Sequence, residues 1–185
     1  MRFLLSLASL LAILLTLLSS PLATAAEPAE ATKVTVFGDG DLDVPAEFKS
    51  VDPKSRIIEH EFEATADGAP APARITMMAA GGDVPANIAR WKGQFAGGNA
   101  DANKTETMKV GQWEVHLVDL NGSFGESMGG GPFSGGKVVQ REDYAMTAAI
   151  LVHPEGQKYF VKMIGPAAVI KANREKFVAM IKSIE

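Results

Sequence analysis

The feature that most constrains the fold of this sequence is the spacing of its apolar residues, which changes along the chain. Over residues 56–64 apolar and polar side chains alternate, which is the period of a half-buried β-strand. Between residues 84 and 95 the spacing becomes that of a helix with one apolar stripe. A second segment of this kind closes the chain after residue 166. The first stripe comprises Val84, Ile88, Trp91 and Phe95.

The expected ends of the two helices follow from residue types with known preferences. Asp83 is suited to cap the first helix and Pro85 to its first turn, and Gly97-Gly98 is expected to end it. The second helix is expected to start at Gly165-Pro166. Its apolar face is formed by Ala167, Ile170, Phe177, Ile181 and Ile184.

Strand-like runs fill most of the remaining chain. Gly- and Pro-rich turns at residues 67–72 and 153–156 are typical of hairpins between neighbouring antiparallel strands. Residues 121–143 are expected to form a long Gly-rich loop. The sequence therefore predicts an α+β fold in two or three layers, with an antiparallel sheet of about six strands and two main helices. The strand-like runs cover residues 33–37, 56–64, 73–79, 105–110, 112–120, 144–152 and 158–164.

The first 25 residues have the pattern of a secretory signal peptide. Arg2 supplies the positive charge, an apolar stretch runs from Leu4 to Leu18, and Ala23-Thr24-Ala25 offers a cleavage site. The apolar stretch is about 15 residues long, whereas a transmembrane helix needs about 20, so an uncleaved membrane anchor is not expected. The sequence has no second hydrophobic run that could span a membrane, so no stable membrane insertion is expected after cleavage. Residues 26–32 are expected to be a disordered lead-in and residues 33–185 a single domain. The protein is therefore predicted to be exported, either periplasmic or secreted.

Composition excludes several classes of function. Cysteine is absent, so disulfides, thiolate metal sites and lipid attachment through cysteine are excluded. The 18 basic and 22 acidic residues give a net charge of −4, which offers no electrostatic footprint for nucleic acid. The three histidines are dispersed, so no metal site and no cofactor are predicted. The expected partner is a protein or a small molecule.

One motif resembles a catalytic site. Residues 125–129 read Gly-Glu-Ser-Met-Gly, a match to the G-x-S-x-G nucleophile elbow, and Asp143 and His153 follow Ser127 in the order of α/β-hydrolases. The elbow requires a helix directly after the serine, but Gly130 and Gly131 follow here. A small exported serine hydrolase using Ser127 is therefore kept as the alternative function, and no catalytic residue is assigned.

The candidate binding residues lie on the first predicted helix and on the Gly-rich segment. Asn87, Arg90 and Gln94 form a polar line beside the apolar stripe. In one interpretation they hydrogen-bond to neighbouring loops and fix the helix on the sheet. In the other they form one wall of a binding site that Phe133 and Lys137 complete, because long loops in compact domains are often functional.

Three segments carry a resemblance to known proteins. Residues 87–95 (NIARWKGQF) after Gly81-Gly82-Asp83, residues 158–166 (KYFVKMIGP) and residues 177–184 (FVAMIKSI) resemble small exported bacterial proteins of unknown function. The order of the predicted elements is similar to the PsbP-like fold, an antiparallel sheet packed between helices. This resemblance implies a binding or assembly role and carries over no catalytic residues. The resulting hypothesis is an exported, soluble, non-enzymatic binding or assembly protein of the cell envelope.

Overall fold

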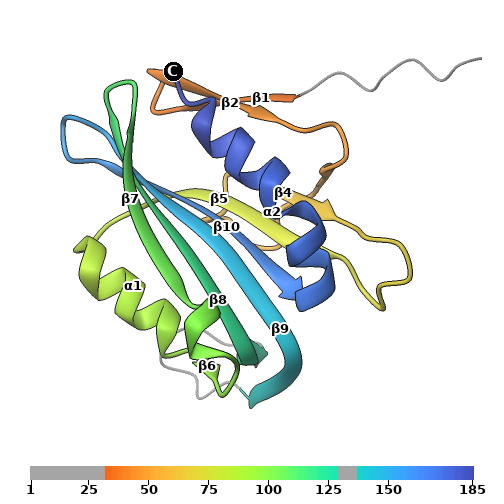
Figure 1. The fold of residues 1–185 in the computed structure, drawn as a ribbon. Coiled ribbons are helices and arrows are strands. Elements are labelled where there is room, and N and C mark those ends of the chain that lie inside the picture. Colours follow the sequence, from red (N-terminus) through yellow and green to blue (C-terminus); the bar gives the residue numbers. More distant parts are fainter. Residues whose placement is uncertain (1–31, 129–136) are drawn as a thin grey trace, which may run out of the picture.

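The computed structural model describes residues 32–128 and 137–185. The predicted signal peptide (1–25), most of the lead-in (26–32) and Phe133 lie outside the described residues. Strands make up most of the described chain (Figure 1). Their bounds are β1 Thr32–Val36, β2 Gly40–Val44, β3 Lys49–Val51, β4 His60–Ala64, β5 Ala73–Ala80, β6 Phe95–Ala96, β7 Lys104–Val110, β8 Trp113–Met128, β9 Lys137–Val152 and β10 Lys158–Pro166.

Eight of these strands form one antiparallel sheet. Its order is β3-β4-β5-β10-β9-β8-β6, and β7 pairs with β8 beside β6. Strands β1 and β2 form a separate two-stranded hairpin. The predicted α+β class is confirmed, but the sheet has more strands than the six or so that were expected. The additional short strands β3 and β6 lie in segments that showed no strand period in the sequence.

Two helices cover opposite faces of the sheet (Figure 1). The longer helix α2, Ala167–Lys182, packs with β1 and β2 over the larger of two buried apolar clusters, which includes Phe62, Ile75 and Phe177. Helix α1, Val84–Lys92, covers a smaller cluster around Trp91 and Phe160. With nine residues α1 is only about 13 Å long, so it covers one part of its face and leaves another part open.

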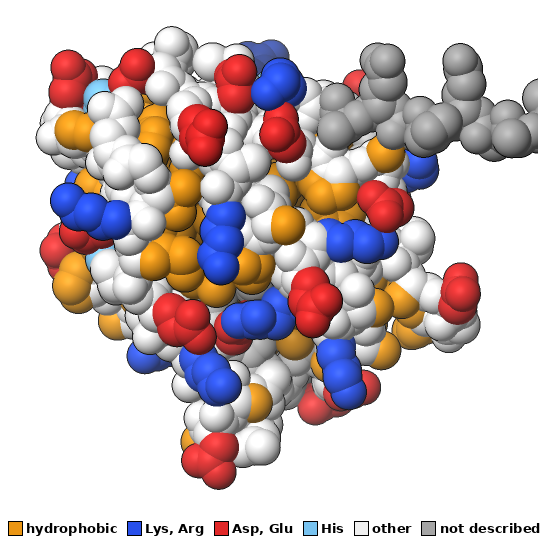
Figure 2. All heavy atoms as spheres, turned by 45° about the horizontal axis from the view of Figure 1, so that its top comes forward, with side chains coloured by type: hydrophobic (Ala, Val, Ile, Leu, Met, Phe, Trp, Pro, Cys, Tyr) orange, Lys and Arg blue, Asp and Glu red, His pale blue; other side chains and the backbone are white. Residues whose placement is uncertain are grey.

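The end of the molecule that carries β1, β2 and the C-terminus has a mixed surface. Figure 2 shows basic and acidic side chains interspersed on this face, with apolar side chains between them. One contact that holds the hairpin here is the bond from the Asp41 backbone N–H to the Glu185 carbonyl, at 3.0 Å. In the described part of the chain, neither helix has the length and apolar content needed to cross a membrane.

The start of each helix agrees with the prediction, but the end of the first does not. Asp83 caps α1 by accepting a hydrogen bond from the Ala86 backbone N–H at 3.1 Å, and α2 begins directly after Pro166. Helix α1 ends at Lys92 rather than at Gly97-Gly98. The predicted end is wrong because the chain turns at Gly93 and joins the edge of the sheet, where Phe95 pairs with Phe124 of β8.

The predicted Gly-rich loop is wrong over most of its length, because β8 continues to Met128 and β9 begins at Lys137. The two strands pair throughout, with a bulge between Gly122 and Phe124. Gly122 has φ +138°, and a Cβ there would lie 2.6 Å from the Ala96 carbonyl oxygen. Glycine is therefore required where β6 approaches β8, so its presence here marks close backbone packing and not a loop.

Candidate functional site

A cavity of about 520 Å³ opens on the part of the sheet that α1 leaves uncovered. Strands β5 and β10 form its floor, and α1 contributes Arg90 and Trp91. The far part of the β8–β9 hairpin and the segment between β3 and β4 complete the lining. The volume lies within the range of pockets that hold small ligands.

Strand alternation determines which side chains face the cavity. Successive residues of a strand point to opposite faces, so every second residue of β5 and β10 lies on the cavity side. The residues between them, such as Ile75 and Met163, are buried in the cluster under α2. The cavity-side residues of the floor are Arg74, Thr76 and Met78 of β5 and Phe160, Lys162 and Ile164 of β10.

The cavity is cationic although the whole chain is acidic. Five basic and two acidic side chains line it, a surplus of three positive charges in a chain of net charge −4. Low-dielectric walls strengthen such a local field, which attracts anions. The basic residues are Lys54, Arg74, Arg90, Arg141 and Lys162, and the acidic residues are Glu63 and Glu126.

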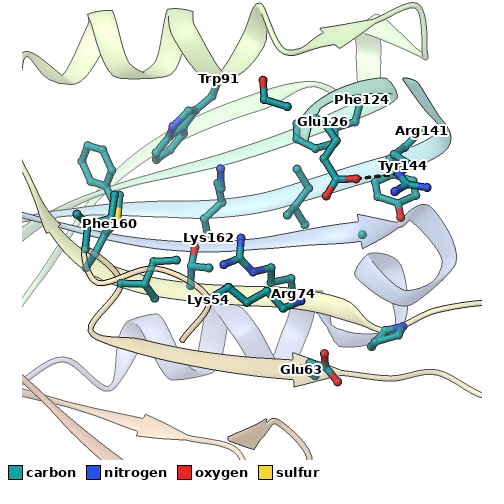
Figure 3. Close-up of a pocket in the computed structure, with 18 of the residues that line it drawn as sticks. Lys54, Glu63, Arg74, Trp91, Phe124, Glu126, Arg141, Tyr144, Phe160 and Lys162 are labelled. Atoms are coloured by element: carbon teal, nitrogen blue, oxygen red, sulfur yellow. Dashed lines mark hydrogen bonds and ion pairs between the residues drawn. The ribbon is translucent and has the colours of Figure 1, made fainter. Parts of the chain in front are cut away.

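Two of these cations have carboxylate partners. The Arg74 guanidinium donates two hydrogen bonds to the buried Glu61 carboxylate, at 2.6 and 2.8 Å. The hydrogen bond from Arg74 is the main reason that the pKa of Glu61 lies below its ordinary value. Arg141 donates to Glu126 at 2.8 Å, the pair drawn with a dashed line in Figure 3. These two pairs offset part of the positive charge.

Lys162 has no such partner. Among the described residues, no carboxylate lies within ion-pair distance of its ammonium group. Figure 3 shows the side chain rising from the cavity floor between Trp91 and Arg74. Its half-burial, together with the nearby charges of Arg74 and Arg90, lowers the pKa of Lys162 from 10.5 to about 8.

Aromatic rings lie on either side of this lysine. Trp91 and Phe160 meet edge to face with centroids 5.2 Å apart, and Phe124 stacks on Tyr144 at 6.3 Å with an interplanar angle of 6°. The bulge in the β8–β9 hairpin positions the second pair, because it shifts the register so that Arg141 pairs with Phe124. A central cation between aromatic surfaces is suited to an anionic group attached to an apolar body.

Of the predicted binding residues, Asn87 is used within the protein. It is 7% exposed, and its Nδ2 donates to the carbonyls of Gly81 and Asp83 at 3.1 and 2.9 Å. Its Oδ1 accepts from Arg90 Nη2 at 2.8 Å. These bonds agree with the interpretation that the polar line fixes the helix to neighbouring loops. They leave Asn87 no free polar atom with which to bind a ligand.

The other predicted residues are separated from one another. Arg90 is exposed and lines the cavity, so it remains a binding candidate. Gln94 follows α1 and is not part of the cavity lining; its Oε1 is buried, and no described residue donates to it. Lys137 is the first residue of β9, and Phe133 lies outside the described residues. A joint site formed by all five residues stays a prediction.

The two interpretations of the polar line predict different effects of substitution. Asn87→Ala is expected to lower the free energy of unfolding by about 1–3 kcal/mol, because the backbone carbonyls of Gly81 and Asp83 and the guanidinium of Arg90 lose their partner. Arg90→Ala is expected to change it by about 0.5 kcal/mol or less, because the side chain is exposed. Urea unfolding of both variants measures this. An equal loss of stability in the two variants would contradict the interpretation that Asn87, and not Arg90, has the structural role.

The Lys162 environment also predicts a gain in stability on substitution. Lys162→Met removes a half-buried charge that lacks a counter-ion, and we expect the free energy of unfolding to rise by about 1–2 kcal/mol at pH 7. The gain should shrink above pH 8, because the folded wild type then releases the proton that the unfolded chain holds up to 10.5. Lys171→Met on the exposed surface of α2 is the control. A loss of stability in Lys162→Met would contradict this description of the site.

The structure does not assemble the triad of the alternative hydrolase function. Ser127 lies within β8, paired with Val138, and not at a strand-to-helix turn. His153 follows the other end of β9, where its Nε2 lies 2.6 Å from Asp39 Oδ2. The chain from Val138 to His153 runs along about 15 residues of β9, or roughly 50 Å of strand length. The alternative of a serine hydrolase using Ser127 is therefore not supported, because the long hairpin places Ser127 and His153 at opposite ends.

Sequence reasoning missed the floor of the cavity. Lys162 and Arg74 stand at cavity-side positions of two strand runs that were identified, each among apolar residues. A lysine on the apolar side of a strand was the available signal. Among residues 32–128 and 137–185, no cluster of three His, Asp or Glu side chains is placed to hold a metal ion. The expectation of no metal and no cofactor stays a prediction.

Comparison with known proteins bears on the fold. No protein-family model matches the sequence, and no curated protein matches it. Among solved structures, the chain is similar to the solution structure of cyanobacterial PsbP (CyanoP) from Synechocystis sp. PCC 6803, with a TM-score of 0.51. The match covers 90% of this chain and 99% of that chain at 9% sequence identity. The fold is PsbP-like.

The PsbP-like fold agrees with the element order predicted from the sequence. At 9% identity the similarity concerns the arrangement of the backbone and not the residues of a site. The resemblance of residues 87–95 to small exported bacterial proteins is not tested by these comparisons and stays a prediction.

Proposed function

We propose that this protein is an exported, soluble, non-enzymatic binding or assembly protein of the cell envelope, and that the cavity beside α1 is its binding site. The observation that carries the proposal is Lys162, a half-buried cation without a carboxylate partner among the described residues, between aromatic walls. Such an arrangement costs stability, and costs of this kind concentrate at functional sites.

Two further observations support a binding role. The fold is PsbP-like, and the sequence resemblance to this fold implied a binding or assembly role. The residues of the proposed hydrolase triad are far apart. The export part of the proposal rests on the signal-peptide pattern of residues 1–25, with cleavage after Ala25 and release to the periplasm or the medium.

Native mass spectrometry of the protein recovered from an exporting bacterial host tests both parts. We expect the mass of a chain that begins at Ala26, together with a bound species. Thr76→Trp should remove that species, because the indole would fill the cavity floor opposite Lys162. Lys171→Trp, on the exposed surface of α2, should retain it.

Different results would contradict the export part and the binding part of the proposal. A full-length mass would contradict export and cleavage. A species retained equally by wild type and Thr76→Trp would place the binding site elsewhere on the protein. A wild type with no bound species would contradict tight binding of a small ligand. The proposed binding role would then require a protein partner, and cross-linking from position 76 in the cell envelope would have to detect it.

A further inference from the structure

The charges that face Lys162 come from every element around the cavity, and together they favour an incoming anion. The carboxylate of Glu61 is already held by Arg74, and that of Glu126 by Arg141. No described carboxylate lies within ion-pair distance of Lys54 or Arg90 either. The charged groups that line the cavity around Lys162 are Glu63 of β4, Arg74 of β5, Arg90 of α1, Glu126 of β8, Arg141 of β9, and Lys54 between β3 and β4, and Glu61 of β4 is bonded to Arg74.

The position of Lys162 sets the charge of the group that fits. Lys162 lies on the floor, whereas Lys54 and Arg90 are exposed. One half-buried ammonium group therefore meets the ligand inside the cavity. A single negative charge would neutralise it and shield it from Arg74 and Arg90. Charge-assisted hydrogen bonds of this kind are stronger than neutral ones, and more so out of water.

The aromatic and apolar residues of the cavity walls determine which uncharged part of a ligand fits. Trp91 and Phe160 lie on one side of Lys162, and Phe124 and Tyr144 towards the β8–β9 hairpin. Ile57, which is 70% exposed, adds apolar surface to the lining. A cavity of about 520 Å³ accepts a small molecule or one terminal residue of a polypeptide, but not a folded segment.

From these contacts we propose that the cavity binds a carboxylate attached to an apolar or aromatic group, with Lys162 as the ion-pair partner of the carboxylate. This inference rests on the proposed binding function and specifies its ligand class. The carboxylate can come from a free organic acid or from the C-terminus of a polypeptide, since both present the same charged group on an apolar body.

Titration with a matched pair of probes tests the ligand class. 3-Phenylpropanoate and its neutral amide, 3-phenylpropanamide, differ in charge but not in shape. We expect the acid to bind at least tenfold more tightly at pH 7, by calorimetry or by NMR shifts of the Trp91 indole. Lys162→Met should weaken the acid at least tenfold and leave the amide unchanged, and Lys171→Met should change neither.

The pH dependence has a defined sign. The acid pairs with the protonated amine, so its affinity should be constant between about pH 6, where the carboxyl group of the probe is ionised, and pH 8, and should fall as Lys162 loses its proton above pH 8. The arginines Arg74, Arg90 and Arg141 keep their charge throughout this range, so they do not account for such a fall. An affinity that is flat up to pH 10 would contradict the ion pair with Lys162.

A second pair of probes separates the two sources of the carboxylate. Acetyl-Gly-Phe with a free C-terminus is compared with the same dipeptide as its amide. Tighter binding of the free dipeptide than of 3-phenylpropanoate indicates a polypeptide C-terminus, and the reverse order indicates a small acid. Either order supports the carboxylate.

Three results would overturn the inference. These are equal binding of acid and amide, an unchanged affinity in Lys162→Met, and no binding of any acid up to about 10 mM, which corresponds to less than about 3 kcal/mol of affinity. None of them decides the proposed function, because the native mass measurement reports any retained species whatever its chemistry. If a bound species is lost in Thr76→Trp but none of the acids binds, the cavity is still the binding site and the proposed carboxylate ligand is wrong.

Discussion

Replacing Trp91 by alanine is expected to lower the free energy of unfolding by about 3–5 kcal/mol, the usual cost of truncating a large buried aromatic side chain. Trp91 is 3% exposed and packs edge to face on Phe160 within the smaller core cluster. An isolated helix of nine residues is not stable in water, so α1 depends on this contact to remain on the sheet. The loss should therefore include the order of α1 itself.

Chemical unfolding and amide hydrogen exchange measure this together. The Trp91→Ala variant should lose exchange protection across α1 before the rest of the sheet does. Lys92→Ala is the matched control, because Lys92 is next to Trp91 in α1 but its side chain is exposed. We expect this substitution to change the free energy of unfolding by about 0.5 kcal/mol or less. A Trp91→Ala variant within about 1 kcal/mol of the wild type would show that α1 is held by other contacts.

The second large effect is expected at Glu61. Glu61→Gln should lower the free energy of unfolding by about 2–3 kcal/mol, because it leaves Arg74 without a counter-ion beside Lys162. The Glu61 side chain is 1% exposed, but that of Arg74 is 38% exposed. Water therefore solvates part of the guanidinium, and the loss should be smaller than for a fully buried pair.

The pH dependence of this loss follows from the direction of the pKa shift. The hydrogen bond from Arg74 lowers the pKa of Glu61 below 4.5, so the folded state binds the proton less readily than the unfolded chain. The pair therefore stabilises the protein fully above the unfolded pKa, and its contribution is lost as the pH falls through the folded pKa. Wild type and Glu61→Gln should converge in stability as the pH is lowered towards 2.

Glu63 provides the control for this experiment. It lies two residues along β4, opposite Arg74 in the strand register, yet Arg74 bonds to Glu61 instead. Figure 3 shows the Glu63 carboxylate turned away from Arg74. Glu63→Gln should therefore change the stability by about 0.5 kcal/mol or less at any pH. A similar loss in both variants would mean that net charge near Arg74 matters and the specific pair does not.

Local residue types predicted much of the secondary structure. Alternation placed strands at 73–79 and 158–164 close to the bounds of β5 and β10, and Asp83 and Pro166 marked the helix starts. The errors occurred where a distant segment decides the conformation. Helix α1 ends early because Phe95 pairs with Phe124 of β8. The Gly-rich segment is extended because β8 and β9 pair along it.

The candidate site was predicted less well, for a related reason. Of the predicted binding residues, Arg90 lines the cavity, and its binding role stays a prediction. Lys162 and Arg74 were not selected, because a charged residue within a strand run gives no sign of what covers its face. Arg141 lies in the segment that was expected to be a loop, and the bulge at Gly122 determines that it pairs with Phe124.

The sequence by itself therefore determined the periods, the helix starts and the overall α+β class, because these depend on neighbours within a few residues along the chain. It also determined which side of β10 each residue faces, since that follows from alternation alone. Only the tertiary structure decided that α1 covers part of its face, that β5 lies beside β10, and that the long hairpin reaches the same cavity. The surroundings of Lys162 come from elements separated by up to about 110 residues, so no local pattern encodes them.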